Sequence, residues 1–150
     1  LLEEGFNISI YDKNKPPILD KRVNFIDGDI LDEKNVNDSI KGNTFVFNFA
    51  GWADMEKSIN FPIEVIKQNI LGNTIVLDGC VKNKVKRYFY ASSIYVFSKS
   101  GSFYRASKQS CELIIKEFQI RFKLPFTILR FGSLYGPGAA MRSCYSSRYL

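Results

Sequence analysis

The chain has 150 residues, of which 45% are hydrophobic and 24% charged, a composition typical of a soluble α/β protein with a real core rather than a disordered segment. It contains no histidine, which excludes a Ser-His-Asp hydrolase, a zinc site with histidine ligands and a histidine general base within these residues. The net charge of +6 is scattered apart from residues 82–87, so we expect no nucleic-acid partner, and an anionic nucleotide ligand accounts for part of the excess equally well.

Short β-branched and aromatic runs alternate with helical patterns along the chain. Residues 1–5 are interpreted as the end of a helix with Gly5 at its C-cap. We predict strands at 7–11, 23–26, 45–50, 87–92 and 126–131, and helices at 32–41, 62–82 and 103–122. The nearly continuous hydrophobicity of the strands indicates burial on both faces. The order predicts an α/β fold, a doubly wound parallel sheet of the Rossmann-like dinucleotide-binding type.

Two parts of such a fold are not found. A doubly wound sheet normally begins with a strand and a glycine-rich turn that seats a pyrophosphate on a helix N-terminus, and neither precedes residue 7. At the other end, Gly136-Pro137-Gly138 begins a loop and no second domain follows. We therefore expect residues 1–150 to be an incomplete dinucleotide-binding domain that lacks its first strand, its glycine-rich turn and a substrate domain, and to be inactive alone.

Targeting and cysteine signals are sparse. No apolar stretch approaches the roughly 20 residues of a membrane-spanning helix, so we expect no membrane partner. The three cysteines, Cys80, Cys111 and Cys144, are odd in number and widely spaced, which favours reduced thiols over disulfides or a metal site. This pattern predicts a cytoplasmic protein without a metal.

Two acidic positions follow predicted strands. Asp12 ends the first strand, where a carboxylate can accept hydrogen bonds from adenosine ribose hydroxyls and repel a 2′-phosphate; a solvated turn aspartate is an equal alternative. Gly28-Asp29-Ile30 follows the second strand and would bracket an adenine ring, although this motif alone is weak.

The strongest chemical signal is Tyr104 with Lys108. Four residues apart on a helix, they project from one face, and the apolar stripe Cys111, Ile115, Phe118 and Phe122 continues along that face. An ammonium beside a phenol favours the phenolate, which is a usable base. Such a pair is usually structural, but its position one strand and one loop after Ser92-Ser93 favours a catalytic role.

Together these motifs resemble the NAD-dependent epimerase/dehydratase family of extended short-chain dehydrogenases/reductases. The resemblance is closest to its sugar-nucleotide epimerases of the UDP-glucose 4-epimerase type. The residues that carry it, in the family's order, are Asn48-Phe49-Ala50-Gly51, Ser58-Ile59-Asn60-Phe61-Pro62, Asn69-Ile70-Leu71-Gly72, Tyr90-Ala91-Ser92-Ser93, Tyr104-Arg105-Ala106-Ser107-Lys108, and Leu129-Arg130-Phe131 through Tyr135-Gly136-Pro137-Gly138.

The resemblance implies the site. Ser93, Tyr104 and Lys108 would be catalytic, and the bound NAD would lie along Asp12, Asp29, Ile30, Phe49, Ala50, Gly51, Asn69, Tyr104, Lys108 and Phe131. Ser93 and Ser133 would contact a nucleotide-sugar substrate. Asn69 has a structural alternative, because it could satisfy a buried backbone group. The cofactor contacts of Phe49 and Phe131 depend on the resemblance alone.

Departures from the family pattern bear on the reaction. Dehydratases and decarboxylases of the family carry acidic residues directly after the catalytic Ser or Thr, where this chain has Ile94 and Tyr95. The segment from Ser93 to Tyr104 is short. Ser133 replaces an asparagine that contacts substrate phosphates, and Asn48 replaces a histidine.

The resemblance implies that the full-length parent is an NAD-dependent sugar-nucleotide epimerase and a homodimer. A keto-sugar reductase using the same residues is the alternative enzyme, and a non-catalytic domain remnant is the alternative of another class.

Overall fold

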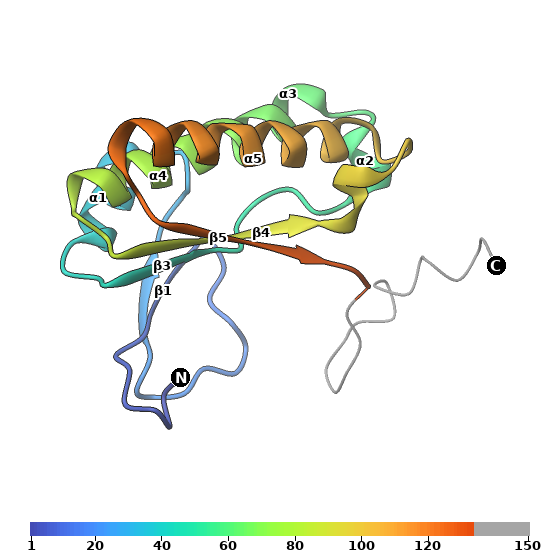
Figure 1. Ribbon diagram of the computed structural model, residues 1–150. Helices are drawn as coiled ribbons and strands as arrows, with labels where there is room; N and C mark the ends of the chain where they lie inside the picture. The colour runs from blue at the N-terminus through green and yellow to red at the C-terminus, as the bar shows by residue number, and fades with distance from the viewer. Residues whose placement is uncertain (134–150) are drawn as a thin grey trace.

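The computed structural model describes residues 1–133, in which parallel strands alternate with helices (Figure 1). The strands are β1 (Ser9–Asp12), β2 (Asn24–Asp27), β3 (Phe45–Asn48), β4 (Arg87–Ser93) and β5 (Phe126–Phe131). They form two hydrogen-bonded parallel sheets, β1-β2 and β3-β4-β5. The predicted α/β class with parallel strands is thus confirmed, as an open and divided sheet within the described residues. Tyr135–Gly138 and Cys144 of the sequence analysis lie outside them.

Two helices follow their sequence signals closely. α1 (Glu33–Ile40) begins after Asp32, whose side chain accepts a hydrogen bond from the backbone N–H of Asn35 at 3.0 Å. α5 (Ser102–Phe122) ends at Lys123, which adopts a left-handed conformation with φ of 58°. Pro125 follows two residues later, where it cannot continue the helix.

The predicted helix at 62–82 is helical throughout but not uniform. It consists of α3 (Pro62–Val65), a π-helical turn η1 (Ile66–Leu71) and α4 (Gly72–Lys82). Isolated π turns inside α-helices occur frequently at functional sites. Two short elements were not predicted, namely α2 (Met55–Ser58) and a 3₁₀ turn η2 (Ile94–Phe97).

The helices lie together on one side of the β3-β4-β5 sheet (Figure 1). The core between these layers combines residues of α1, α4, α5 and β4, including Leu77, Cys80, Tyr88, Cys111 and Ile115, each at most 1% exposed. Burial raises the pKa of the Cys80 thiol to about 12, so this cysteine is an inert core residue. Within the described residues, no helix is long and apolar enough to cross a membrane.

The opposite face of β3 carries an aromatic row. Phe45, Phe47 and Phe49 are 40%, 42% and 62% exposed, and the Phe47 ring stacks on Phe89 of β4 at 4.2 Å. The expectation that every strand is buried on both faces is therefore wrong for β3. Phe122 is also 52% exposed, so the buried stripe of α5 stops before it.

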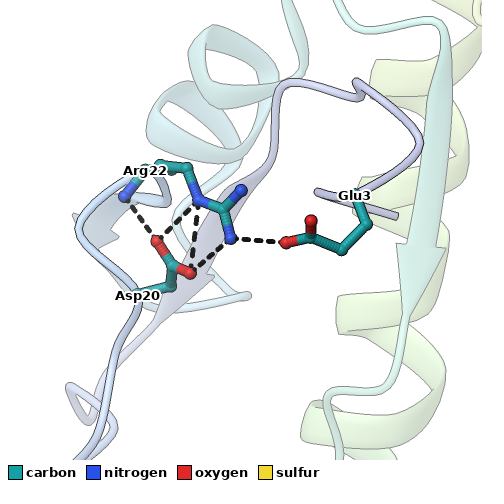
Figure 2. A network of polar contacts seen from close by, with 3 residues as sticks. All are labelled: Glu3, Asp20 and Arg22. Carbon is teal, nitrogen blue, oxygen red and sulfur yellow. Dashed lines mark hydrogen bonds and ion pairs between the residues drawn. The ribbon is translucent and has the colours of Figure 1, made fainter.

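The N-terminal segment is tied to the loop before β2. Phe6 and Gly5 donate backbone hydrogen bonds to the carbonyls of Leu1 and Leu2, the pattern of a helix C-terminus, and Gly5 has φ of +80°. Arg22 bridges Glu3 and Asp20, with its guanidinium 2.8 Å from each carboxylate (Figure 2). All three side chains are exposed, so this network orients the segment and contributes little to stability.

Candidate active site

Lys108 is the buried centre of the candidate site. It lies on the second turn of α5, is 6% exposed, and donates a hydrogen bond of 2.8 Å to the carbonyl of Ala91 in β4. Its ammonium lies 4.8 Å from the Tyr90 ring centre and 5.8 Å from the Tyr104 ring centre. Burial lowers the pKa of Lys108, while the nearby Cys111 acts in the opposite direction. The structure therefore brings Tyr104 and Lys108 together beside the end of β4.

Asn69 connects this pair to the end of β3. Its side-chain amide donates to the Ser107 hydroxyl at 2.8 Å, and that hydroxyl donates to the carbonyl of Tyr104 at 2.8 Å. Its side-chain oxygen accepts from the backbone N–H of Trp52 at 2.6 Å, while its backbone carbonyl accepts from the Cys111 thiol at 3.1 Å. The π-helical turn η1 thus presents Asn69 to three segments at once. Satisfying the Trp52 backbone is the structural role that the sequence left open for Asn69.

Gly51 lies against the same side chain. Its φ is +143°, and a Cβ atom there would lie 2.7 Å from the side-chain oxygen of Asn69. A residue with a side chain would strain the backbone and collide with Asn69. The chain after β3 therefore passes close to η1, and the Asn69 side chain occupies the space that a Cβ on Gly51 would need.

Ser93 ends β4 and is 6% exposed. Its hydroxyl oxygen accepts a 3.3 Å hydrogen bond from the N–H of Tyr95 and so caps η2. Ser93 is linked to Lys108 through the β4 backbone, because the Lys108 ammonium donates to the carbonyl of Ala91, two residues before Ser93. Ser93 thus lies at the same end of β4 as the Tyr104–Lys108 pair.

The residues expected at the nucleotide end lie at the end of β1 or directly after β2. The Asp12 carboxylate is exposed at the end of β1 and accepts from the N–H of Asn14 at 2.8 Å. Asp29 instead binds the Lys13 ammonium at 2.7 Å and the N–H of Leu31 at 2.9 Å, and these contacts lower its pKa. Asp12 and Asp29 therefore engage different partners.

Ile30 and Gly28 are shaped by packing. Ile30 is 7% exposed in the core, where a Cβ on Gly72 would approach its side chain to 2.9 Å. The Tyr11 ring covers Gly28, where a Cβ would lie 2.3 Å from the ring, and the Tyr11 hydroxyl donates to the carbonyl of Asp29 at 2.8 Å. The Ile30 side chain is thus a core group.

The remaining predicted residues lie near the ends of β3 and β5. The rings of Phe49 and Phe131 lie 6.3 Å apart, and Ala50 is exposed beside Phe49. Ser133 is exposed two residues after β5. These positions share one end of the parallel strands with Ser93, the usual location of a ligand in such sheets.

Sequence reasoning missed an ion pair beside this site, in which a buried glutamate meets a more exposed arginine. Glu112 of α5 accepts hydrogen bonds from Arg130 of β5 and from Ser92 of β4. Its position four residues after Lys108, next to the apolar stripe, was the available signal. A glutamate on the inner side of a helix needs a cationic partner, and Arg130 lies in a strand that was predicted correctly.

This arrangement has the parts of a proton-transfer site. It combines a phenol with a neighbouring buried ammonium, and a serine hydroxyl at the adjacent strand end. Within residues 1–133, no cluster of histidine, cysteine, aspartate or glutamate side chains is arranged to hold a metal ion. Any acid–base chemistry by these residues would be carried by the phenol, the ammonium and the hydroxyl.

Comparisons with known proteins identify the family and the fold. Residues 1–148 match the model of the NAD dependent epimerase/dehydratase family. The chain is 27% identical over 131 residues to a dTDP-glucose 4,6-dehydratase of Streptomyces antibioticus, covering 79% of this chain and 39% of that protein.

Two solved structures have a similar fold. The UDP-glucose 4-epimerase of Thermotoga maritima with UDP-glucose superposes with a TM-score of 0.83 at 26% identity, covering 91% of this chain and 50% of that one. The Thermus thermophilus UDP-glucose 4-epimerase in complex with NAD gives 0.84 at 25% identity, covering 93% and 51%. The chain thus spans about half or less of the length of these relatives.

Proposed function

The chain belongs to the NAD-dependent epimerase/dehydratase family, and we propose that the natural protein is a sugar-nucleotide epimerase that transfers hydride reversibly at a sugar ring carbon. The observation that carries the proposal is the Tyr104–Lys108 pair, whose ammonium lies 5.8 Å from the phenol ring beside the strand that ends at Ser93. The proposal concerns the natural protein, whatever its length.

Tyr104 is the proposed base. It takes the proton from the sugar hydroxyl that becomes a ketone, and the buried Lys108 ammonium stabilises the resulting phenolate. Ser93 accepts from the N–H of Tyr95, which leaves its own hydroxyl proton to donate to the substrate oxygen. Ser133 is proposed as a further substrate contact.

One observation supports the binding of a dinucleotide by the described residues. Gly51, in the turn after β3, is exposed and carries no side chain, so a ligand can approach its backbone on the side away from Asn69. When bound, NAD supplies a reversible hydride acceptor for the sugar carbon. We propose that Asp12 holds the adenosine ribose hydroxyls and Lys108 the nicotinamide ribose. Asp29, Phe49, Ala50, Gly51, Asn69 and Phe131 are proposed to line the rest of the cofactor, and Ile30 is proposed to contact it through its backbone because its side chain packs in the core.

An epimerase is favoured over a dehydratase by the side chains after Ser93. Expulsion of water needs a proton donor, whereas Ile94 and Tyr95 offer no carboxyl group. The buried carboxylate in this region is Glu112. Burial raises its pKa, but the hydrogen bonds from Arg130 and Ser92, together with the charges of Arg130 and Lys116, lower it by more, so Glu112 stays ionised and is a poor acid.

Product analysis tests the proposal. Purified natural protein is incubated separately with UDP-glucose and dTDP-glucose, the sugars named for its relatives, and the products are examined by NMR and mass spectrometry. An epimer of unchanged mass, formed without net consumption of added NADH, is expected.

Other products would replace the proposal. Loss of water indicates a dehydratase, and NADH consumption in each turnover indicates a keto-sugar reductase. A protein that binds neither sugar nor cofactor would be a non-catalytic remnant. The homodimer and the cytoplasmic location remain predictions, to be checked by light scattering and by fractionation.

A further inference from the structure

One buried carboxylate joins three elements next to the proposed catalytic residues. Glu112 of α5 accepts a 2.6 Å hydrogen bond from the Ser92 hydroxyl of β4. Its two oxygens also accept from Nε and a terminal nitrogen of Arg130 in β5, at 2.9 and 2.8 Å. Such bidentate, charge-assisted pairs are strong and fix geometry as well as charge. The Glu112 side chain is 9% exposed, which limits competition from water.

Each attachment lies directly beside a residue of the proposed site. Ser92 precedes Ser93 in β4, and Glu112 lies one helical turn after Lys108 on α5. Arg130 is paired in register with Ser92, and the next pair in the same ladder is Ser93 with Phe131. The Glu112 carboxylate therefore sets how the strand that carries Ser93 lies against the helix that carries Tyr104 and Lys108.

Arg130 also holds the chain on the other side of Ser93. Its guanidinium carbon lies 4.8 Å from the centre of the Phe97 ring at the end of η2. η2 starts immediately after Ser93, so Ser93 lies between two anchored positions, Ser92 through Glu112 and Phe97 through Arg130. Guanidinium groups stack favourably on aromatic rings, even where the ring is as exposed as Phe97 at 75%.

We propose that Glu112 is a positioning residue for the hydride transfer, because its bonds to Ser92 and Arg130 fix Ser93 relative to the Tyr104–Lys108 pair. This inference rests on the proposed function. Glu112 itself touches neither substrate nor cofactor in this scheme. Displacement of reacting groups by about 1 Å can slow an enzyme by about 100-fold, so loosening this carboxylate should affect the chemical step more than substrate binding.

The test compares Glu112→Gln with wild type in the natural protein, using Glu117→Gln as the matched control on an exposed position of the same helix. Glu112→Gln should lower kcat by about 10- to 100-fold and change KM for the sugar nucleotide by less than about threefold. The deuterium isotope effect on kcat, with substrate labelled at the reacting ring carbon, should increase because hydride transfer becomes rate-limiting. Glu117→Gln should behave as wild type.

The isotope effect separates positioning from loss of folded protein. A merely structural role lowers the active fraction and leaves the isotope effect and KM unchanged. The double variant Ser92→Ala with Glu112→Gln should have a kcat only slightly lower than that of Glu112→Gln alone, because both substitutions act on the same Ser92–Glu112 hydrogen bond. If wild type is active and Glu112→Gln has a normal kcat, the positioning role is refuted and the proposed function stands. An inactive wild type would refute the proposed function and, with it, this role.

Discussion

The ammonium of Lys108 lies 4.8 Å from the centre of the Tyr90 ring, under a strand and almost sealed from solvent. Within residues 1–133 this ammonium forms no ion pair. It contacts the rings of Tyr90 and Tyr104 and donates a hydrogen bond to the carbonyl of Ala91. A cation held by ring faces and a carbonyl keeps its charge at a cost in stability, because burial lowers the pKa of Lys108. The buried charge of Lys108 therefore costs stability, which fits its proposed role in catalysis.

Replacing Lys108 with methionine should stabilise the protein and abolish turnover. The pKa of Lys108 is lower in the folded than in the unfolded protein, so the unfolded state binds the proton more tightly. The free energy of unfolding of wild type should therefore rise as the pH increases through the folded pKa toward 10.5. Lys108→Met should lack this rise and unfold at higher urea than wild type at pH 7. Lys116→Met, at an exposed position of α5, is the control. A Lys108→Met variant less stable than wild type at pH 7 would contradict this account.

Tyr104→Phe should remove the proposed base and leave the fold unchanged. The aromatic ring beside Lys108 is retained and only its hydroxyl is lost, so the melting temperature should stay close to that of wild type. Turnover by the natural protein should fall by about 100- to 10,000-fold, the usual contribution of general-base catalysis. Steady-state kinetics and circular dichroism check both expectations, and near-normal turnover would show that Tyr104 is structural.

The cofactor preference should be NAD over NADP. A 2′-phosphate would meet the Asp12 carboxylate, while the nearby Lys13 ammonium is committed to Asp29 at 2.7 Å. Calorimetry on the natural protein, freed of bound cofactor, should give the lower Kd for NAD, and Asp12→Ser should narrow the difference. Tighter binding of NADP to wild type would show that Asp12 is an ordinary turn residue.

Gly28→Ala should destabilise the protein more than Gly132→Ala. A Cβ on Gly28 would lie 2.3–2.4 Å from the Tyr11 ring, which must move and give up its hydrogen bond to Asp29. Overpacking of this kind costs about 1–3 kcal/mol. At Gly132 the nearest atom is 3.8 Å away, so alanine there should change stability by less than about 0.5 kcal/mol. Urea unfolding of both variants measures the difference, and equal stabilities would contradict the close approach of Tyr11.

The contribution of Glu112 to stability should depend on pH. Burial raises its pKa, but the hydrogen bonds from Arg130 and Ser92 and the charges of Arg130 and Lys116 together outweigh burial, so the net pKa is lowered in the folded protein. The stabilisation is thus complete above the unfolded value of 4.5 and disappears as the pH falls through the folded pKa. Glu112→Gln should be less stable than wild type at pH 7 by about 1–3 kcal/mol, and the difference should shrink at pH 3. A constant difference at both pH values would mean that Glu112 is not ionised.

Local patterns predicted the regular elements well. The bounds of β5 agree with the predicted strand, and α1 differs from its prediction only by the cap residues Asp32 and Lys41. These boundaries depend on caps and on the onset of apolar runs, which are visible in the sequence. The wide turn η1 could not be predicted, because it is associated with the tertiary hydrogen bonds of Asn69 to Trp52 and Ser107.

The site was predicted in part. The spacing of Tyr104 and Lys108 placed them on one side of α5, and the structure brings them together beside β4. The Arg130–Glu112 pair was missed because it joins positions 18 residues apart across a strand and a helix. Hydrophobic periodicity identifies the buried face of each helix or strand, but it does not show which polar side chains on different elements contact one another. Likewise, the division of the strands into two sheets depends on long-range pairing.

Trp52 is the one tryptophan in these 150 residues, and its backbone is hydrogen-bonded in both directions to the Asn69 side chain. Its indole N–H donates to the carbonyl of Asp54, and its ring lies 5.7 Å from Phe61. The chain therefore carries an intrinsic fluorophore next to the proposed cofactor-binding segment. Its emission reports on the junction between β3 and η1 without any attached label, so titrations and stopped-flow mixing can follow that junction directly.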